Sequence, residues 1–404
     1  MKRPKLSLCM ILRDEASMLP AFFESLSGLT YELVVVDTGS VDDTVALCEA
    51  AGARVLHFEW IDDFSAARNM GLEAARGSWI LFLDADERPS EEVKRQITEV
   101  MADEGAGAAT VIMRNELPHG NRRDAALLRL FRAHKEVRFR YPIHEDVTGP
   151  VLERLRVEGR SMVHLSGVVR HLGYVRQTMA DRDKKQRDLR ILGGCLREDP
   201  DDLYAHFKIL ELARFWGDQP LLGRSAGAAL ESLRRTDKLR LRDLHYGGDL
   251  LISIAQGHYL DHEEDQLSFL SQWSHRVAPS AALLYWRGLK KENLGQTAGA
   301  EEDFRAAMEV PGTRDVQMTT VRPRMGLCRI AMAKGDLPGA TDHANHALDA
   351  NGQDAEVIMA SLFLSQLQGG DSAARSLAKE HEATFGPSEA LCQALRQLGL
   401  EGQP

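Results

Sequence analysis

Short apolar runs alternate with helix-like segments along the first part of the chain. The run at residues 32–36 is rich in β-branched residues, and between the runs apolar residues recur at helical spacing. The expected strands are residues 6–12, 32–36, 53–58 and 79–83, and the expected helices are residues 18–29, 41–51 and 66–75. We expect Ser40 to cap the second helix and Gly77 to stop the third. This alternation is typical of a largely parallel sheet with helices on both faces.

Later strands are predicted at residues 109–113, 127–131 and 163–169, where the rhythm is less regular. They favour a sheet that closes with mixed strand directions. We therefore predict an α/β domain with a Rossmann-like mixed sheet over residues 1–178.

Strand signals vanish from about Met179 onward, and Ala/Leu-rich helices with Gly-Asp turns dominate. Part of the pattern around Gly335 recurs around Gly369, an interval of about 34 residues. That period indicates an all-α domain of tetratricopeptide-like repeats over residues 179–404. Unrelated helical hairpins are the alternative, because the copies match poorly.

Composition agrees with two folded domains, since the 404 residues are 44% hydrophobic and 27% charged. The net charge of -10 argues against a binder of nucleic acid or of anionic membranes. Five scattered cysteines suggest reduced thiols in a cytoplasmic protein. Residues 6–12 are too short for a signal peptide, and no apolar run is long enough to span a membrane.

Carboxylates follow two of the predicted strands. Asp37 ends one strand, and Asp84 and Asp86 follow another. Ligands of such sheets bind at the carboxyl ends of the strands. Asp84 and Asp86 are two residues apart in an extended segment, so they point the same way and could share Mg²⁺ or Mn²⁺. A solvated acidic turn is the bland alternative for this pair.

Several motifs together resemble a known family. They are Leu8 to Glu15, Val34 to Ser40, Asp63 to Asn69 and Asp84 to Glu87, in that order. The set resembles family 2 glycosyltransferases of the GT-A fold. It is most similar to a bacterial subgroup with C-terminal repeats that includes glycosyltransferases modifying cysteine in bacteriocin peptides.

The resemblance implies roles for individual residues at the donor site. Asp37 would contact the nucleobase and Asp84 the ribose, while Asp86 would ligate the metal. Arg68 and Asn69 would help to hold the nucleotide. Asp14 stands where many members have asparagine, and it adds a negative charge near the expected base pocket.

Two further segments match the subgroup. Residues 141–146 include the Ile-His-Glu motif, and an inverting transfer needs a base for the acceptor proton. Glu145 is our first candidate for that base and Asp146 the second, with a surface ion pair as the alternative reading of Glu145. His171, in a His-x-Gly-Tyr block, is a candidate metal ligand or phosphate contact; otherwise it is a structural histidine.

The sequence thus predicts a glycosyltransferase that moves a sugar from a nucleoside diphosphate-sugar, with UDP as in relatives, to a peptide, protein or glycan. The alternative is a repeat-based scaffold that binds a peptide or protein and carries an inactive glycosyltransferase-like domain. A nucleotidyltransferase would need a basic glycine-rich loop after the first strand, which residues 12–16 do not provide. The repeats could dock the acceptor or form a homodimer.

Overall fold

The computed structural model describes residues 5–116, 122–172, 181–259, 262–311 and 315–400. It divides into two compact units, Met1–His245 and Tyr246–Pro404. The domain boundary predicted between residues 178 and 179 lies outside the described residues. In the structure, the helices between residues 181 and 242 belong to the same compact unit as the sheet.

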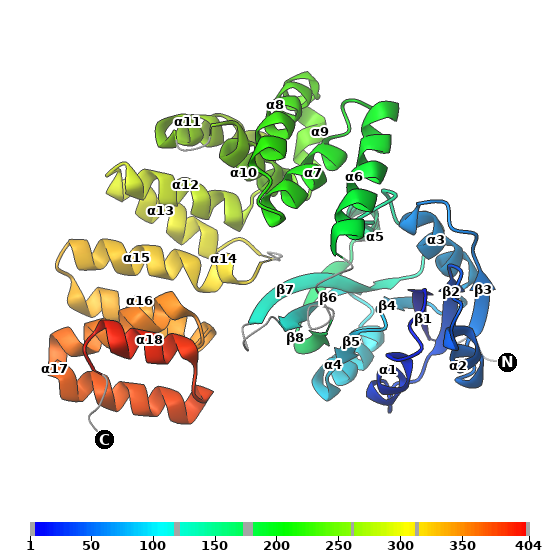
Figure 1. Cartoon of the computed structure of the whole chain (residues 1–404), viewed down its shortest axis with the longest axis horizontal. Coiled ribbons are helices and arrows are strands. Elements are labelled where there is room, and N and C mark those ends of the chain that lie inside the picture. Colours follow the sequence, from blue (N-terminus) through cyan, green and yellow to red (C-terminus); the bar gives the residue numbers. More distant parts are fainter. Residues whose placement is uncertain (1–4, 117–121, 173–180, 260–261, 312–314, 401–404) are drawn as a thin grey trace. The chain divides into compact units, whose positions relative to one another are not determined.

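An eight-stranded mixed sheet forms the centre of the first unit (Figure 1). Its order is β3-β2-β1-β4-β7-β6-β8-β5. The first four of these strands are parallel, β7 is antiparallel to both its neighbours, and β5 is antiparallel to β8. The mixed α/β prediction is confirmed. The strands are β1 (Leu6–Leu12), β2 (Glu32–Asp37), β3 (Arg54–His57), β4 (Trp79–Phe82), β5 (Glu87–Pro89), β6 (Ala106–Glu116), β7 (Arg122–Arg132) and β8 (Ser161–His171).

Three helices of the first unit overlap the predicted segments 18–29, 41–51 and 66–75, although two boundary signals were wrong, and the helices at residues 91–102 and 148–158 were not predicted. The helices are α1 (Leu19–Ser25), α2 (Thr44–Ala50), α3 (Phe64–Ala74), α4 (Glu91–Ala102), α5 (Thr148–Glu158), α6 (Asp181–Glu198), α7 (Leu203–Phe215), α8 (Gln219–Arg235) and α9 (Lys238–Arg242). Ser40 does not cap α2, because its hydroxyl accepts the amide of Asp14 instead. Gly77 does not stop α3, which already ends at Ala74; it is buried against Ser7.

Alternate residues of β1 divide the core between the two faces of the sheet. Leu8 and Met10 pack with α1, α2 and α4 on one face. Cys9 packs on the other face with residues of α3 and α5. This period of two is the side-chain alternation of a strand buried on both faces. Burial of each such side chain contributes about 1.5–3 kcal/mol, so the sheet is a firm support for the loops at its ends.

Antiparallel helix pairs build the second unit. Gly295 and Gly335 turn between paired helices with φ of 73° and 76°, a conformation that suits glycine. Asp336 then caps the helix after Gly335. The prediction of tetratricopeptide-like repeats is confirmed by this helix–turn–helix arrangement. The helices are α10 (Gly247–His258), α11 (Glu263–Trp273), η3 (Ser274–Arg276), α12 (Ala281–Asn293), α13 (Thr297–Met308), α14 (Gln317–Thr320), α15 (Arg322–Ala333), α16 (Leu337–Ala350), α17 (Ala355–Phe385) and α18 (Glu389–Gln397).

Within the described parts of the chain, no helix combines the length and the apolar character needed to cross a membrane.

Candidate functional site

Asp37 is a buried carboxylate at the carboxyl end of β2. It accepts backbone amides from Gly39 over 3.2 Å and from Ser40 over 3.1 Å, and His57 Nδ1 lies 3.5 Å away. Burial alone would raise the pKa of Asp37, but the hydrogen bonds from Ser40 and Gly39 bring it below its ordinary value. The loop after β2 therefore holds a fixed negative charge where a nucleobase contact is predicted.

Asp14 ties the loop after β1 to the loop after β2. Its Oδ1 accepts the amide of Val41 over 2.8 Å, and its own amide donates to Ser40 Oγ over 3.0 Å. The residue has a φ of 54°, a left-handed conformation in which asparagine and aspartate are enriched. Either side chain can make this bond, which accounts for aspartate where the family often has asparagine. Its contact with the nucleotide stays a prediction.

Arg68 lies at the centre of the site, on α3. The helix begins after Asp63, whose Oδ1 accepts the amide of Ala66 over 2.8 Å. The buried guanidinium of Arg68 donates from Nε to Glu145 over 2.5 Å and from Nη2 to Asp84 over 3.0 Å. Burial alone would lower the pKa of Arg68, but Asp84 and Glu145 raise it. Arg68 therefore remains a cation and joins two of the predicted site residues.

The Asn69 side chain is turned toward the backbone of Phe139. Its Nδ2 donates to the carbonyl of Phe139 over 2.9 Å, and its Oδ1 accepts the amide of Phe139 over 2.8 Å. This pair of bonds fixes the chain just before residues 140–146. The predicted nucleotide contact of Asn69 stays a prediction.

Asp84 and Glu87 occupy different environments although they are close in sequence. Asp84 is partly exposed; burial alone would raise its pKa, but Arg68 and Arg129 bring it below its ordinary value. Glu87 is buried, accepts the amide of Asp84 and pairs with Arg129 Nη2 over 2.5 Å. Burial raises the pKa of Glu87 to about 6. The sequence did not predict this supporting role of Arg129, because β7 shows no motif around it.

Asp86 and His171 meet where β5 pairs with β8. His171 Nε2 lies 3.2 Å from Asp86 Oδ2, and its Nδ1 lies 2.8 Å from Asn115 Oδ1. Burial alone would lower the pKa of His171, but Asp86 raises it. The contact of Nδ1 with Asn115 fixes the ring and thereby orients Nε2 toward Asp86. Metal-bound histidines are usually held in this way by a partner on the second ring nitrogen.

The pair fits a divalent cation that takes its remaining ligands from elsewhere. Within the described ranges, no three histidine, cysteine or acidic side chains gather as a complete metal cluster. Asp86 and His171 could supply two ligands to Mn²⁺ or Mg²⁺, with phosphate oxygens and water as the others. Gly173 and Tyr174 of the predicted His-x-Gly-Tyr block lie outside the described residues.

Residues 140–146 present Glu145 and Asp146 in different ways. Glu145 is directed at Arg68. Asp146 instead accepts the amide and the hydroxyl of Thr148 at the start of α5 over 3.0 and 2.8 Å, and its Oδ2 lies 3.3 Å from His245 Nε2. The structure therefore brings Glu145 to Arg68 and Asp84, whereas Asp146 serves the following helix.

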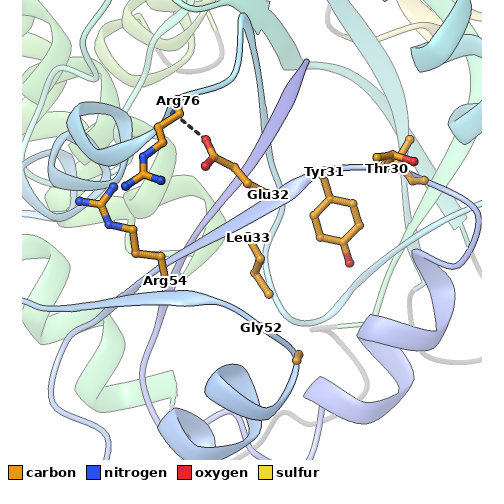
Figure 2. Close-up of a pocket in the computed structure, with 9 residues that line it drawn as sticks. Thr30, Tyr31, Glu32, Leu33, Gly52, Arg54 and Arg76 are labelled. Atoms are coloured by element: carbon orange, nitrogen blue, oxygen red, sulfur yellow. Dashed lines mark hydrogen bonds between the residues drawn. The ribbon is translucent and has the colours of Figure 1, made fainter. Parts of the chain in front are cut away.

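A separate hollow of about 570 Å³ lies by the amino ends of β2 and β3. Figure 2 shows Arg54 and Arg76 beside Glu32, with the hydrogen bond from the Arg76 backbone to Glu32 dashed. Glu32 also accepts the amide of Gly77 over 3.1 Å. None of the predicted site residues lines this hollow, which lies at the ends of the strands opposite to Asp37.

Comparisons with known proteins find similarity to glycosyltransferases in the part of the chain that forms the sheet. Residues 7–154 match the model of glycosyl transferase family 2. A TPR repeat-containing protein of Synechococcus elongatus is 36% identical over 60% of this chain and 60% of its own length. The SPbeta prophage-derived glycosyltransferase SunS of Bacillus subtilis is 27% identical over 49% of this chain and 47% of its own. The chain thus spans about half to three fifths of the length of these relatives.

Among solved structures, glucosyl-3-phosphoglycerate synthase from Mycobacterium tuberculosis overlaps 47% of this chain and 78% of its own, with 20% identity and a TM-score of 0.34. The type IV pilus biogenesis factor PilW overlaps 54% of this chain and 93% of its own, with 16% identity and a TM-score of 0.42. The chain therefore combines a segment, residues 7–154, that matches the model of glycosyl transferase family 2 with the tetratricopeptide-like helical hairpins that follow it.

Proposed function

We propose that the chain is an enzyme that transfers a sugar from a nucleoside diphosphate-sugar, with UDP as the first candidate nucleotide, to a peptide, protein or glycan acceptor. The observation that carries the proposal is the convergence of Asp84 and Glu145 on one buried arginine, Arg68, at the carboxyl ends of the parallel strands. The donor would lie across Asp37 and Asp84, beside Asp86.

Glu145 is the proposed base. As the acceptor nucleophile bonds to the anomeric carbon, the bond from that carbon to the diphosphate oxygen breaks, and the acceptor proton passes to Glu145. Arg68 keeps Glu145 oriented, and Asp146 is the weaker candidate because Thr148 and His245 engage its oxygens. The configuration at the anomeric carbon is inverted by this direct displacement.

Asp86 and His171 are the proposed holders of Mn²⁺ or Mg²⁺. A bound cation would supply positive charge near the departing diphosphate. The repeats are proposed to dock the acceptor or to form a homodimer, and the protein is proposed to act in the cytoplasm.

Nucleotide release tests the proposal without knowledge of the acceptor, because water can replace it. Purified protein is incubated with UDP-, GDP- and dTDP-sugars and with Mn²⁺, Mg²⁺ or EDTA. We expect release from one nucleotide class, dependent on metal and lost in Glu145→Gln. If no donor is cleaved and none raises the melting temperature, the enzyme proposal fails and the scaffold reading is favoured.

A further inference from the structure

Residues 140–146, which carry Glu145, have an unusual backbone. Tyr141 and His144 have φ of 73° and 53°, in the left-handed region that large side chains rarely adopt. Such residues persist only where surrounding contacts determine the conformation. The segment is closed by a pair of backbone hydrogen bonds between Arg140 and Asp146, of 2.9 and 3.0 Å. It is therefore a tight loop whose shape depends on its neighbours.

The start of α3 supplies one set of restraining contacts. The Phe64 amide donates to the carbonyl of Pro142 over 2.7 Å, and Ser65 Oγ donates to the carbonyl of Tyr141 over 2.5 Å. These bonds fix the first half of the loop. They do not reach the peptide bond that joins His144 to Glu145.

Helix α7 supplies the contact at that peptide bond, through Tyr204. The hydroxyl of Tyr204 donates to the carbonyl of His144 over 2.5 Å. Its ring stacks on Tyr141, with centroids 3.6 Å apart and planes 11° apart. One side chain thus holds both left-handed residues of the loop, and Tyr204 itself is only 5% exposed.

The loop is also anchored in an apolar cluster next to Tyr204. Ile143 is buried with Ile191 and Leu192 of α6 and with Ala205 and Ile209 of α7. Ile143 lies in this cluster, whereas Glu145, two residues further on, contacts Arg68 of α3. Tyr204 then sets the orientation of the peptide plane from which Glu145 extends to Arg68.

We infer that Tyr204 is a positioning residue for the reaction: from α7, it holds the His144–Glu145 peptide so that Glu145 faces the acceptor. This inference rests on the proposed function of Glu145 as the base. Tyr204 is proposed to touch neither donor nor acceptor. It acts by fixing the loop, so its loss should lower turnover and leave donor binding intact.

Tyr204→Phe is the test variant, because phenylalanine keeps the stack on Tyr141 and removes only the hydroxyl. A misplacement of a reacting group by about 1 Å can cost about 100-fold in rate. We expect kcat for metal-dependent nucleotide release to fall about tenfold, with KM for the donor within about twofold of wild type. Tyr285→Phe, at a buried tyrosine of the second unit, is the matched control and should leave both constants unchanged.

Hydrogen exchange of the peptide covering residues 139–148 provides a readout that does not depend on activity. In Tyr204→Phe its amides, including that of Asp146, should exchange about tenfold faster, while peptides of β1 and β4 keep wild-type rates. Wild-type kcat or wild-type exchange of this peptide in Tyr204→Phe would overturn the inference. So would a rise in KM with no change in kcat.

The two proposals fail in different ways. If wild-type protein releases no nucleotide from any donor, the proposed function is refuted, and the exchange measurement alone decides whether Tyr204 holds the loop. If wild type releases nucleotide and Glu145→Gln does not, while Tyr204→Phe equals wild type, only the positioning inference is refuted.

Discussion

Arg68 donates a hydrogen bond from Nε to Oε1 of Glu145 over 2.5 Å, although the two residues are 77 positions apart in the chain. The same guanidinium also donates to Asp84. One cation thus connects α3, the end of β4 and the loop of residues 140–146. Its removal would leave the largely buried Glu145 and the partly exposed Asp84 without the cation that they share.

Replacement of Arg68 should therefore be costly for stability. We expect Arg68→Met to lower the free energy of unfolding by about 3–5 kcal/mol, as is usual when one partner of a buried ion pair is lost. Arg76→Met removes an exposed arginine and should change the free energy of unfolding by less than about 0.5 kcal/mol. Urea unfolding followed by circular dichroism makes the comparison. Equal losses in the two variants would contradict the central role of Arg68.

Glu145→Gln should separate stability from reaction. The amide oxygen can still accept the hydrogen bond from Arg68 Nε, so we expect a loss of only about 1–2 kcal/mol of unfolding free energy. Glutamine cannot take up the acceptor proton, so nucleotide release should fall at least about 100-fold. Release kinetics and urea unfolding on the same preparation test both parts. Wild-type release would exclude Glu145 as the base.

Metal dependence should be lost in Asp86→Asn. The carboxylate lies 3.2 Å from His171 Nε2, and a neutral amide is a weaker ligand for Mn²⁺. A ligand that binds the native state raises the melting temperature, so the extra shift given by Mn²⁺ with a nucleotide-sugar should disappear in the variant. Asp342→Asn, an exposed aspartate of α16, should keep that shift. A shift retained by Asp86→Asn would place the metal elsewhere.

Gly77 leaves no room for a side chain. A Cβ there would lie 2.6 Å from both the amide nitrogen and Oγ of Ser7 in β1. Gly77→Ala should therefore lower the free energy of unfolding by about 1–3 kcal/mol through overpacking. Gly193 lies in the interior of α6, and a Cβ there would be 3.6 Å from the nearest atom, Arg197 Nη1. Gly193→Ala should therefore raise the free energy of unfolding by about 0.5–1 kcal/mol. Chemical denaturation of the two variants shows whether the free energy of unfolding falls in Gly77→Ala and rises in Gly193→Ala.

Thiol reactivity should single out one cysteine. Burial raises the pKa of Cys9 to about 12 and that of Cys48 to about 11, and Cys328 is also buried. Cys392 is exposed. Because the thiolate is the reactive form, iodoacetamide at pH 8 should label Cys392 first in the native protein and all five cysteines in urea. Rapid labelling of Cys9 or Cys48 in the native protein, detected by peptide mass spectrometry, would contradict the burial of these two thiols in the first unit.

The sheet and its order of elements were predictable because its signal is local. The apolar runs of residues 6–12 and 32–36 are typical of central strands buried on both faces. Short elements escaped this reasoning. The strand of residues 87–89 has too few residues to show a period, and its pairing with His171 is a long-range contact.

The site was predictable in its residue types but not in its connections. Asp37, Asp84 and Asp86 follow strands, so their positions come from the order of elements. The bridge by Arg68 and the contacts of Asp146 with Thr148 depend on how distant loops fold back, which no spacing encodes. Ser40 was misread as a helix cap because a serine before a helix looks the same when its hydroxyl serves a neighbouring loop.

Tyr204 and the cluster around Ile143 also bear on how such chains can recombine in evolution. A crossover near residue 178 would keep every family motif but exchange α6 and α7. These two helices provide the surface on which the Glu145 loop packs. A crossover after His245 would carry that surface along with the sheet. The part of this chain that shapes the Glu145 loop is therefore longer than the matched residues 7–154, and an exchange of repeats beyond α9 would leave it intact.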